Sequence, residues 1–131
     1  MEEFDIAIIG GGPAGIMAAI AASADLNIVL LEKNSSLGSK LLITGGGRCN
    51  ITNEKPIKKL LNSFHDKNFL KHSFYTFTNE MLLDLFRNRG LDFIVEDNNR
   101  VFPETEKSQD ILAILKYYLK DITIKYNYEV S

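Results

Sequence analysis

Tryptophan is absent from the 131 residues, and the chain has only one cysteine, two histidines and three prolines. The single cysteine, Cys49, excludes an internal disulfide and any paired-cysteine redox or zinc motif, as is common in a reducing compartment. We therefore expect a cytoplasmic protein in which Cys49 is a small buried thiol. His65 and His72 have no nearby carboxylate pair at ligand spacing, so we interpret both as solvated side chains and predict no metal site.

An excess of charge of one sign is also lacking, since 15 basic and 17 acidic residues give a formal net charge of -2. The basic residues are scattered among acidic ones, and we interpret the densest pair, Lys58 and Lys59, as a solvated helix face. This distribution predicts no nucleic-acid partner. The apolar run 6–22 follows acidic residues and is interrupted by glycines and Pro13, so it favours neither a secretion signal nor a membrane span, and we expect no membrane partner.

The order of the apolar runs predicts an α/β fold in one compact unit. Residues 4–9 end at a glycine and predict a strand that is buried on both faces. Pro13 suits a first helical turn because its missing N–H is not needed there, and the small residues of 14–24 favour a helix that lies close to a sheet. The all-apolar run 28–31 predicts a second strand, which completes the βαβ unit of a Rossmann-like parallel sheet.

The residues after this unit predict a loop, an insertion and a last crossover. Residues 34–53 are rich in Ser, Gly, Thr and Asn, and we expect a long structured loop with a short helix before its glycines. The elements expected after it are helices at 56–64, 68–74 and 79–88, a β-hairpin formed by 91–95 and 100–102, a helix at 108–119 and a strand at 122–130. The domain then spans 1–131 with a helical insertion and hairpin at about 54–105, and right-handed crossovers predict the strand order 3-2-1.

Two of these helices carry recognisable ends and faces. Gly90 is the expected C-cap of the helix at 79–88, and Ser108 is the expected N-cap of the helix at 108–119. The predicted apolar face of the first is Met81, Leu82, Leu85 and Phe86, and that of the second is Ile111, Leu112, Leu115 and Leu119.

The predicted junction of strand and helix, "IIGGGPAGIMAA" at residues 8–19, contains Gly10, Gly12 and Gly15 in the spacing G-x-G-x-x-G. The first glycine permits a tight turn, the second lets a pyrophosphate approach the backbone, and the third lets the helix pack closely on the strand. The start of the helix adds free N–H groups and a partial positive charge. Glu32 follows at the end of the second strand, where its carboxylate can accept hydrogen bonds from an adenosine ribose. Together these features predict a dinucleotide site.

A second glycine-rich stretch, "ITGGGRCNIT" at residues 43–52, bears on which dinucleotide is bound. A flavin gains from backbone amides close to its flat ring, and the glycines 45–47 can bring the backbone that near. Arg48 and Asn50 are suited to hold phosphate oxygens or the polar edge of a flavin. An NAD-linked dehydrogenase needs no such loop and is a weaker alternative. An ordinary flexible loop with a salt-bridged arginine stays open as a third interpretation.

Three longer segments resemble one family of flavoproteins, and they are "DIAIIGGGPAGIMAAIAA", "VLLEKNSSLGSKLLITGGGRCNITN" and "RVFPETEKSQDIL". Together they are similar to the N-terminal third of the YhiN-like (BaiN-like) family of FAD-dependent NAD(P)/FAD oxidoreductases, which have two dinucleotide-binding domains. The resemblance implies FAD as cofactor, NAD(P)H as a candidate reductant, and hydride or electron transfer to a small-molecule substrate that the sequence does not identify. No catalytic side chain is evident.

The resemblance also implies a set of cofactor-binding residues. The pyrophosphate would be held by Gly10, Gly12, Pro13, Ala14 and Gly15, and the ribose by Glu32 with Lys33 beside it. The rest of the cofactor would be approached by Lys40, Gly46, Arg48, Cys49 and Asn50, and the adenine by the main chain of Val130 on the third strand.

A second family signature covers Arg100 to Pro103 with Lys107 and Ser108, and the resemblance places it on the substrate side of the flavin. Asn99 stands where the family usually has glycine. Family members continue into a substrate-side domain and a later glycine-rich strand that closes the FAD site, so we expect an incomplete domain with an exposed sheet edge. A truncated, noncatalytic dinucleotide-binding fragment is therefore the alternative to a functional front part of an oxidoreductase.

Overall fold

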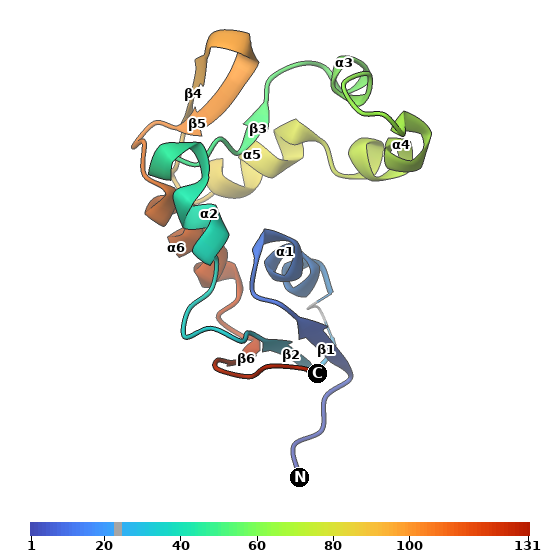
Figure 1. Cartoon of the computed structure of the whole chain (residues 1–131), viewed down its shortest axis with the longest axis vertical. Helices are drawn as coiled ribbons and strands as arrows, with labels where there is room; N and C mark the ends of the chain where they lie inside the picture. Colours follow the sequence, from blue (N-terminus) through green and yellow to red (C-terminus); the bar gives the residue numbers. More distant parts are fainter. Residues whose placement is uncertain (23–24) are drawn as a thin grey trace.

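The computed structural model describes residues 1–22 and 25–131 and contains two small sheets with helices packed on and between them (Figure 1). The first sheet is parallel and consists of β1 (Ile6–Ile9), β2 (Ile28–Leu31) and β6 (Thr123–Lys125) in the order β1-β2-β6. Read from the last strand, this is the predicted order 3-2-1. The α/β class and the Rossmann-like core are thus confirmed.

The prediction that β1 is buried on both faces is wrong. Ile6 and Ile8 are half-buried, whereas Ala7 and Ile9 are exposed, Ile9 to 66%. The physical reason is that α1 (Pro13–Ala22) packs on one face of β1, while Ala7 and Ile9 on the other face stay open to solvent. An apolar run indicates a strand, but only the packed neighbours decide whether both faces are covered.

Helix α1 begins at Pro13, as predicted, and its side chains Ile16 and Ala19 are fully buried. The expected continuation of this helix through residues 23–24 lies outside the described residues. At its first turn the helix lies directly against the end of β1, because a Cβ atom on Gly15 would stand 1.9 Å from the carbonyl oxygen of Gly10. The third glycine of the fingerprint therefore has the close-packing role that the sequence predicts.

The long segment after β2 is structured, as expected. It contains the short helix α2 (Ser39–Ile43), the 3-10 turn η1 (Thr44–Gly47) and the two-residue strand β3 (Thr52–Asn53). Strand β3 was not predicted, because two residues are too few to show a period.

The expected insertion, residues 54–105, contains the three predicted helices, α3 (Ile57–Leu61), α4 (Lys67–Thr76) and α5 (Asn79–Arg87). Helices α3 and α4 project from the body of the molecule in Figure 1, and α4 has no buried residue. Lys58 and Lys59 are exposed, as predicted.

Helix α5 has Asn88, not the predicted Gly90, at its C-cap, and it presents a slightly different face. Gly90 adopts a left-handed φ of 80°, and the N–H of Leu91 donates to the carbonyl of Phe86 (3.2 Å), which is a Schellman-type end. Leu83 and Phe86 are its buried side chains, whereas Met81 of the predicted face is exposed.

The predicted hairpin is formed by β4 (Phe93–Glu96) and β5 (Arg100–Pro103), joined by the turn η2 (Asp97–Asn99). Asn99, where the resemblance led us to expect glycine, has a φ of 58°. Asparagine tolerates this left-handed conformation better than most residues, so the turn is kept without glycine. β5 also pairs with β3, which gives a second sheet in the order β3-β5-β4.

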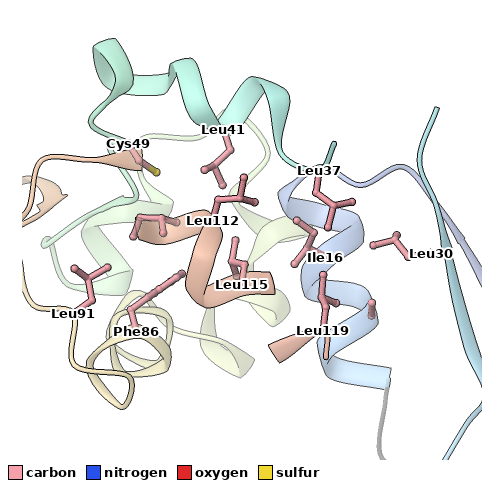
Figure 2. Close-up of a cluster of buried hydrophobic side chains, with 12 residues drawn as sticks. Ile16, Leu30, Leu37, Leu41, Cys49, Phe86, Leu91, Leu112, Leu115 and Leu119 are labelled. Atoms are coloured by element: carbon pink, nitrogen blue, oxygen red, sulfur yellow. The ribbon is translucent and has the colours of Figure 1, made fainter. Parts of the chain in front are cut away.

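Helix α6 (Ser108–Tyr118) presents the predicted apolar face, since all four predicted side chains are buried. Figure 2 shows Leu112 and Leu115 of α6 in one cluster with Ile16, Leu41 and Phe86. The core therefore joins the parallel sheet's helix to the insertion.

Ser108 is not the N-cap of α6, contrary to the sequence-based prediction. Lys107 occupies the capping position, and Ser108 is a fully buried first residue of the helix. Its hydroxyl donates to the carbonyl oxygen of Leu42 (2.8 Å). The end of the short helix α2 leaves carbonyls without helical partners, and Ser108 satisfies one of them.

The last strand is shorter than predicted, because β6 ends at Lys125 and Val130 lies beyond it. Asn127 has a φ of 53°, which breaks the extended conformation. The chain nevertheless stays beside β2, since the N–H of Tyr128 donates to the carbonyl of Glu32 (2.9 Å).

We predict that Gly15→Ala destabilises the fold, because the added methyl would collide with the Gly10 carbonyl. Overpacking of this kind costs about 1–3 kcal/mol, measurable by urea unfolding. Gly12→Ala is the matched control, since a Cβ atom on Gly12 meets nothing within 4 Å. Equal unfolding midpoints for the two variants would contradict the close-packing role.

Candidate functional site

A cleft of about 410 Å³ opens at the carboxyl ends of β1 and β2. Its lining includes the glycine-rich turn, the start of α2 and the tail after β6. Among the sequence-predicted residues it brings together Gly10, Gly12, Pro13, Glu32, Lys33, Lys40 and Val130. In a parallel sheet this end of the strands is where nucleotides bind. We call it the first cleft.

The glycine-rich turn leaves room for a ligand at Gly12, the second glycine of the G-x-G-x-x-G spacing. A Cβ atom on Gly12 would meet nothing within 4 Å, so the surface above it is open. The first hydrogen bond of α1 runs from the N–H of Ile16 to the carbonyl of Gly12 (3.0 Å), and the N–H groups of Ala14 and Gly15 precede it. Such amides at a helix start suit a phosphate group. The turn therefore fits a dinucleotide pyrophosphate.

Glu32 is only 6% exposed, and its carboxylate is occupied by the protein itself. Oε1 accepts hydrogen bonds from the backbone N–H and the side-chain amide of Asn34, and Oε2 accepts one from the N–H of Gly11, all at 2.7 Å. The bond from the Asn34 N–H, joined by the other two, holds the pKa of Glu32 below its usual range although burial acts in the opposite direction. Because a carboxylate offers about four acceptor positions, one on Oε2 is left for a ligand hydroxyl.

A second cleft, of about 480 Å³, lies between α1, α5 and α6. Most of its lining is apolar, with Met17, Leu82 and Phe86 among the side chains. Pro13 and Lys40 line both clefts, so the two meet at the start of α1. Ala14, Cys49 and Asn50 from the predicted set also line the second cleft.

The loop of three glycines turns beside this second cleft. Gly45 and Gly46 have left-handed φ values of 56° and 68°, which explains the need for glycine. A Cβ atom on Gly46 would meet nothing within 4 Å, whereas one on Gly45 would stand 2.8 Å from the N–H nitrogen of Asn50. Gly46 therefore presents bare backbone, and Gly45 allows the loop to fold back on itself.

Cys49 is buried, as predicted, and has no disulfide partner. Burial raises the pKa of its thiol, so the sulfur is protonated and weakly nucleophilic at neutral pH. The neighbouring Asn50 side-chain amide donates to the carbonyls of Val101 (3.3 Å) and Thr52 (3.0 Å) when its nitrogen faces these acceptors. Asn50 thus joins the loop to β3 and β5 as well as facing the cleft.

Arg48 points away from both clefts. Its guanidinium donates to Glu96 (2.6 Å) and Glu106 (2.9 Å) and lies 4.1 Å from the ring centroid of Phe102. The hydrogen bond with Glu96, followed by that with Glu106, raises the pKa of Arg48. The ion pairs of Arg48 are thus observed, whereas a direct contact of Arg48 with a cofactor stays a prediction.

The second signature lies against this loop. Val101, Phe102 and Pro103 are buried, and Arg100 is exposed. The two partners of Arg48, Glu96 and Glu106, were not predicted. Asn34 and Tyr128, which lie beside Glu32, were not predicted either. No spacing in the sequence indicates them, because Asn34 meets Glu32 through a turn, and the others meet their partners across about fifty residues or more.

Two further properties concern the described parts of the chain. In residues 1–22 and 25–131 no helix is long and apolar enough to cross a membrane. The same residues contain no group of three or more His, Cys, Asp or Glu side chains arranged to hold a metal ion.

Comparison with known proteins identifies a family and several relatives. The family described as "HI0933-like protein Rossmann domain" matches residues 4–131. The chain is 33% identical over 123 residues to the 3-dehydro-bile acid delta(4,6)-reductase of Clostridium scindens, and this alignment covers 92% of this chain and 30% of that protein. It is also 33% identical over 118 residues to the ribosomal RNA dihydrouridine synthase of Escherichia coli, and that alignment covers 88% of this chain and 28% of the synthase. The chain therefore spans less than a third of these curated relatives.

A solved structure shows the same fold. The crystal structure of Thermovibrio ammonificans THI4 superposes with a TM-score of 0.53 at 16% identity, covering 95% of this chain and 38% of that one. At this identity the likeness concerns the fold alone.

We predict that Glu32→Ala lowers the free energy of unfolding by about 1–3 kcal/mol, because the N–H groups of Gly11 and Asn34 lose their acceptors. Urea unfolding measures the loss. Glu129→Gln, an exposed carboxylate of the same cleft, is the control.

The contribution of Glu32 also has a defined pH dependence. Since its pKa is lowered in the folded state, the stabilisation is complete above the unfolded value of about 4.3 and is lost as the pH falls through the lower folded pKa. The wild-type protein should therefore lose more stability on acidification below that pH than Glu32→Gln does. Parallel stability curves for the two proteins would show that the Glu32 hydrogen bonds contribute nothing.

Proposed function

The chain belongs to the HI0933-like Rossmann domain family, whose members bind FAD, and we propose that it holds FAD across its two clefts as the front part of a flavin-dependent oxidoreductase. The observation that carries this proposal is the meeting of the clefts at Pro13 and Lys40, at the start of α1. FAD has two unlike ends joined by a pyrophosphate. A cleft with charged and polar groups in its lining and a more apolar cleft, which meet at a helix N-terminus, match that order.

The adenosine end occupies the first cleft in this proposal. The free acceptor position of Glu32 takes a ribose hydroxyl, and Lys33 lies beside it. Val130, although outside β6, lines the same cleft and supplies main-chain contact to the adenine. Since Glu32 is ionised, it also disfavours a ribose that carries a phosphate.

The pyrophosphate lies over the turn of Gly10, Gly12, Pro13, Ala14 and Gly15. The open surface above Gly12 admits it, and the ammonium group of Lys40 neutralises part of its charge from the rim that both clefts share. Lys40 is exposed and has no ion pair among the described residues, so its charge is available to a ligand.

The flavin end faces the glycine loop and the second cleft. Gly46 presents bare backbone to it, and Cys49 and Asn50 line the wall that it would contact. Bound flavin would supply hydride and electron transfer. The residues of the chain hold and orient it, and the apolar lining excludes water from its surroundings.

The activity of the whole protein is part of the same proposal, with NAD(P)H as reductant and a small molecule as substrate. The names of the two relatives give a bile acid and a ribosomal RNA, and these unlike substrates do not select one for this chain. The alternative, a noncatalytic fragment, differs in one observable: it would bind no FAD, or bind FAD that dithionite cannot reduce.

The first test is the visible absorption spectrum of the purified chain, followed by a titration of colourless protein with FAD. Yellow protein, or saturable quenching of flavin fluorescence in the micromolar range (about -8 kcal/mol), supports the proposal. Folded protein that leaves FAD fluorescence unchanged contradicts it for this chain, and binding of NAD without preference for FAD would favour the NAD-linked alternative.

We predict that Gly12→Val weakens FAD binding at least about tenfold, or 1.4 kcal/mol, because the branched side chain fills the space above the turn. Isothermal titration measures the dissociation constant. Ala18→Val is the control, because Ala18 is exposed on the same helix and outside both clefts. Unchanged affinity in Gly12→Val would place the pyrophosphate elsewhere.

A further inference from the structure

The guanidinium of Arg48 is directed at the β4–β5 hairpin and the turn after it, although Arg48 belongs to the glycine loop. We propose that Glu96 and Glu106 are positioning residues, which hold the loop 44–50 in shape through Arg48. The effect on the loop follows from the chain alone, whereas its consequence for FAD rests on the proposed function.

The two carboxylates hold Arg48 unequally. Glu96 accepts from both terminal nitrogens of the guanidinium, from Nη1 at 2.6 Å and from Nη2 at 3.3 Å, which is a two-point contact. Glu106 accepts from Nη1 alone at 2.9 Å, and its side chain is 53% exposed against 29% for Glu96. Two-point, less exposed pairs are the stronger ones, so Glu96 should have the larger effect.

Phe102 gives the cluster a fixed support. Its ring is almost fully buried, and the guanidinium of Arg48 lies over it at 4.1 Å. A Cβ atom on Gly45 would stand 3.0 Å from Cε1 of the same ring. Gly45 and Arg48 of the loop therefore both lie against one buried side chain, and the ion pairs determine which way Arg48 lies across it.

The backbone next to these contacts is held in an unfavourable conformation. Cys49, which follows Arg48, has a φ of 60°, and Glu106 has a φ of 55°. Residues other than glycine adopt such left-handed angles only where surrounding contacts maintain them. When the ion pairs are removed, we expect the loop to relax and the Cys49 side chain to leave its buried position.

Glu96 and Glu106 line neither cleft, whereas Cys49 and Asn50 line the second one. The acids therefore act on that wall through Arg48, without touching a ligand.

The test uses Cys49 as a reporter, since it is the single thiol and is buried. The reaction of native protein with an aromatic disulfide is followed by the absorbance of the released thiolate. We expect Glu96→Gln to accelerate the reaction about fivefold to tenfold, Glu106→Gln to have a smaller effect, and the matched control Glu104→Gln to have none. Glu104 is exposed in the same segment and forms no ion pair within the described ranges.

Urea unfolding of the same variants separates loop opening from general destabilisation. A positioning role requires that Glu96→Gln react faster at its thiol while its unfolding midpoint stays close to that of Glu104→Gln. It also requires that Glu96→Asp, which keeps the charge, bring the rate back towards that of the wild type. Equal thiol rates in Glu96→Gln and Glu104→Gln would overturn the proposal. An increase that only matches the loss of global stability would overturn it as well.

FAD titration adds a separate result. If wild-type protein binds FAD, Glu96→Gln should bind it more weakly than Glu104→Gln, and equal affinities would remove the consequence for the cofactor. If wild-type protein does not bind FAD, the proposed function fails for this chain, and the thiol rates still decide whether the two acids hold the loop.

Discussion

The buried carboxylate of Glu32 is the interaction on which the first half of the site depends. Glu32 directly follows β2, and its carboxylate accepts the N–H of Gly11 in the neighbouring turn and the backbone and side-chain N–H groups of Asn34 in its own loop. The backbone N–H of Glu32 donates to the carbonyl of Lys125 on the third strand. Burial of a charge is unfavourable, and these short charge-assisted bonds offset that cost. One side chain therefore joins the glycine turn, the middle strand and the following loop into a single cleft wall.

The second half of the site has a different kind of support. The glycine loop has internal backbone hydrogen bonds, from the N–H of Cys49 to the carbonyl of Thr44 and from the N–H of Arg48 to that of Gly45. Its other contacts come from the hairpin and the start of α6, some fifty residues later. Ser108 binds the carbonyl of Leu42, Asn50 faces Val101, and Glu96 holds Arg48. The hairpin and the start of α6 thus hold the loop in place. This explains why the second signature, Arg100 to Pro103 with Lys107 and Ser108, lies beside the glycine-rich stretch 43–52.

Local patterns predicted most of the elements and the core of the site. Runs of apolar residues indicated both first strands, Pro13 indicated the start of α1, and the glycine spacing indicated the turn, because each of these depends on neighbours within a few residues. The errors share another cause. The exposure of Ile9, the role of Ser108 and the end of β6 before Val130 depend on what packs against each residue, which a period in the sequence does not contain.

The sequence by itself determined the class of fold, the strand order, the dinucleotide fingerprint and the family, because turns, helix starts and close approaches of backbone need particular residue types at fixed short spacings. Only the tertiary structure decided that Glu32 already carries three hydrogen bonds, that Arg48 turns to Glu96 and Glu106, and that two clefts meet at Pro13 and Lys40. These features join residues far apart in the chain. Their contact energies depend on packing in space, and spacing along the sequence does not record it.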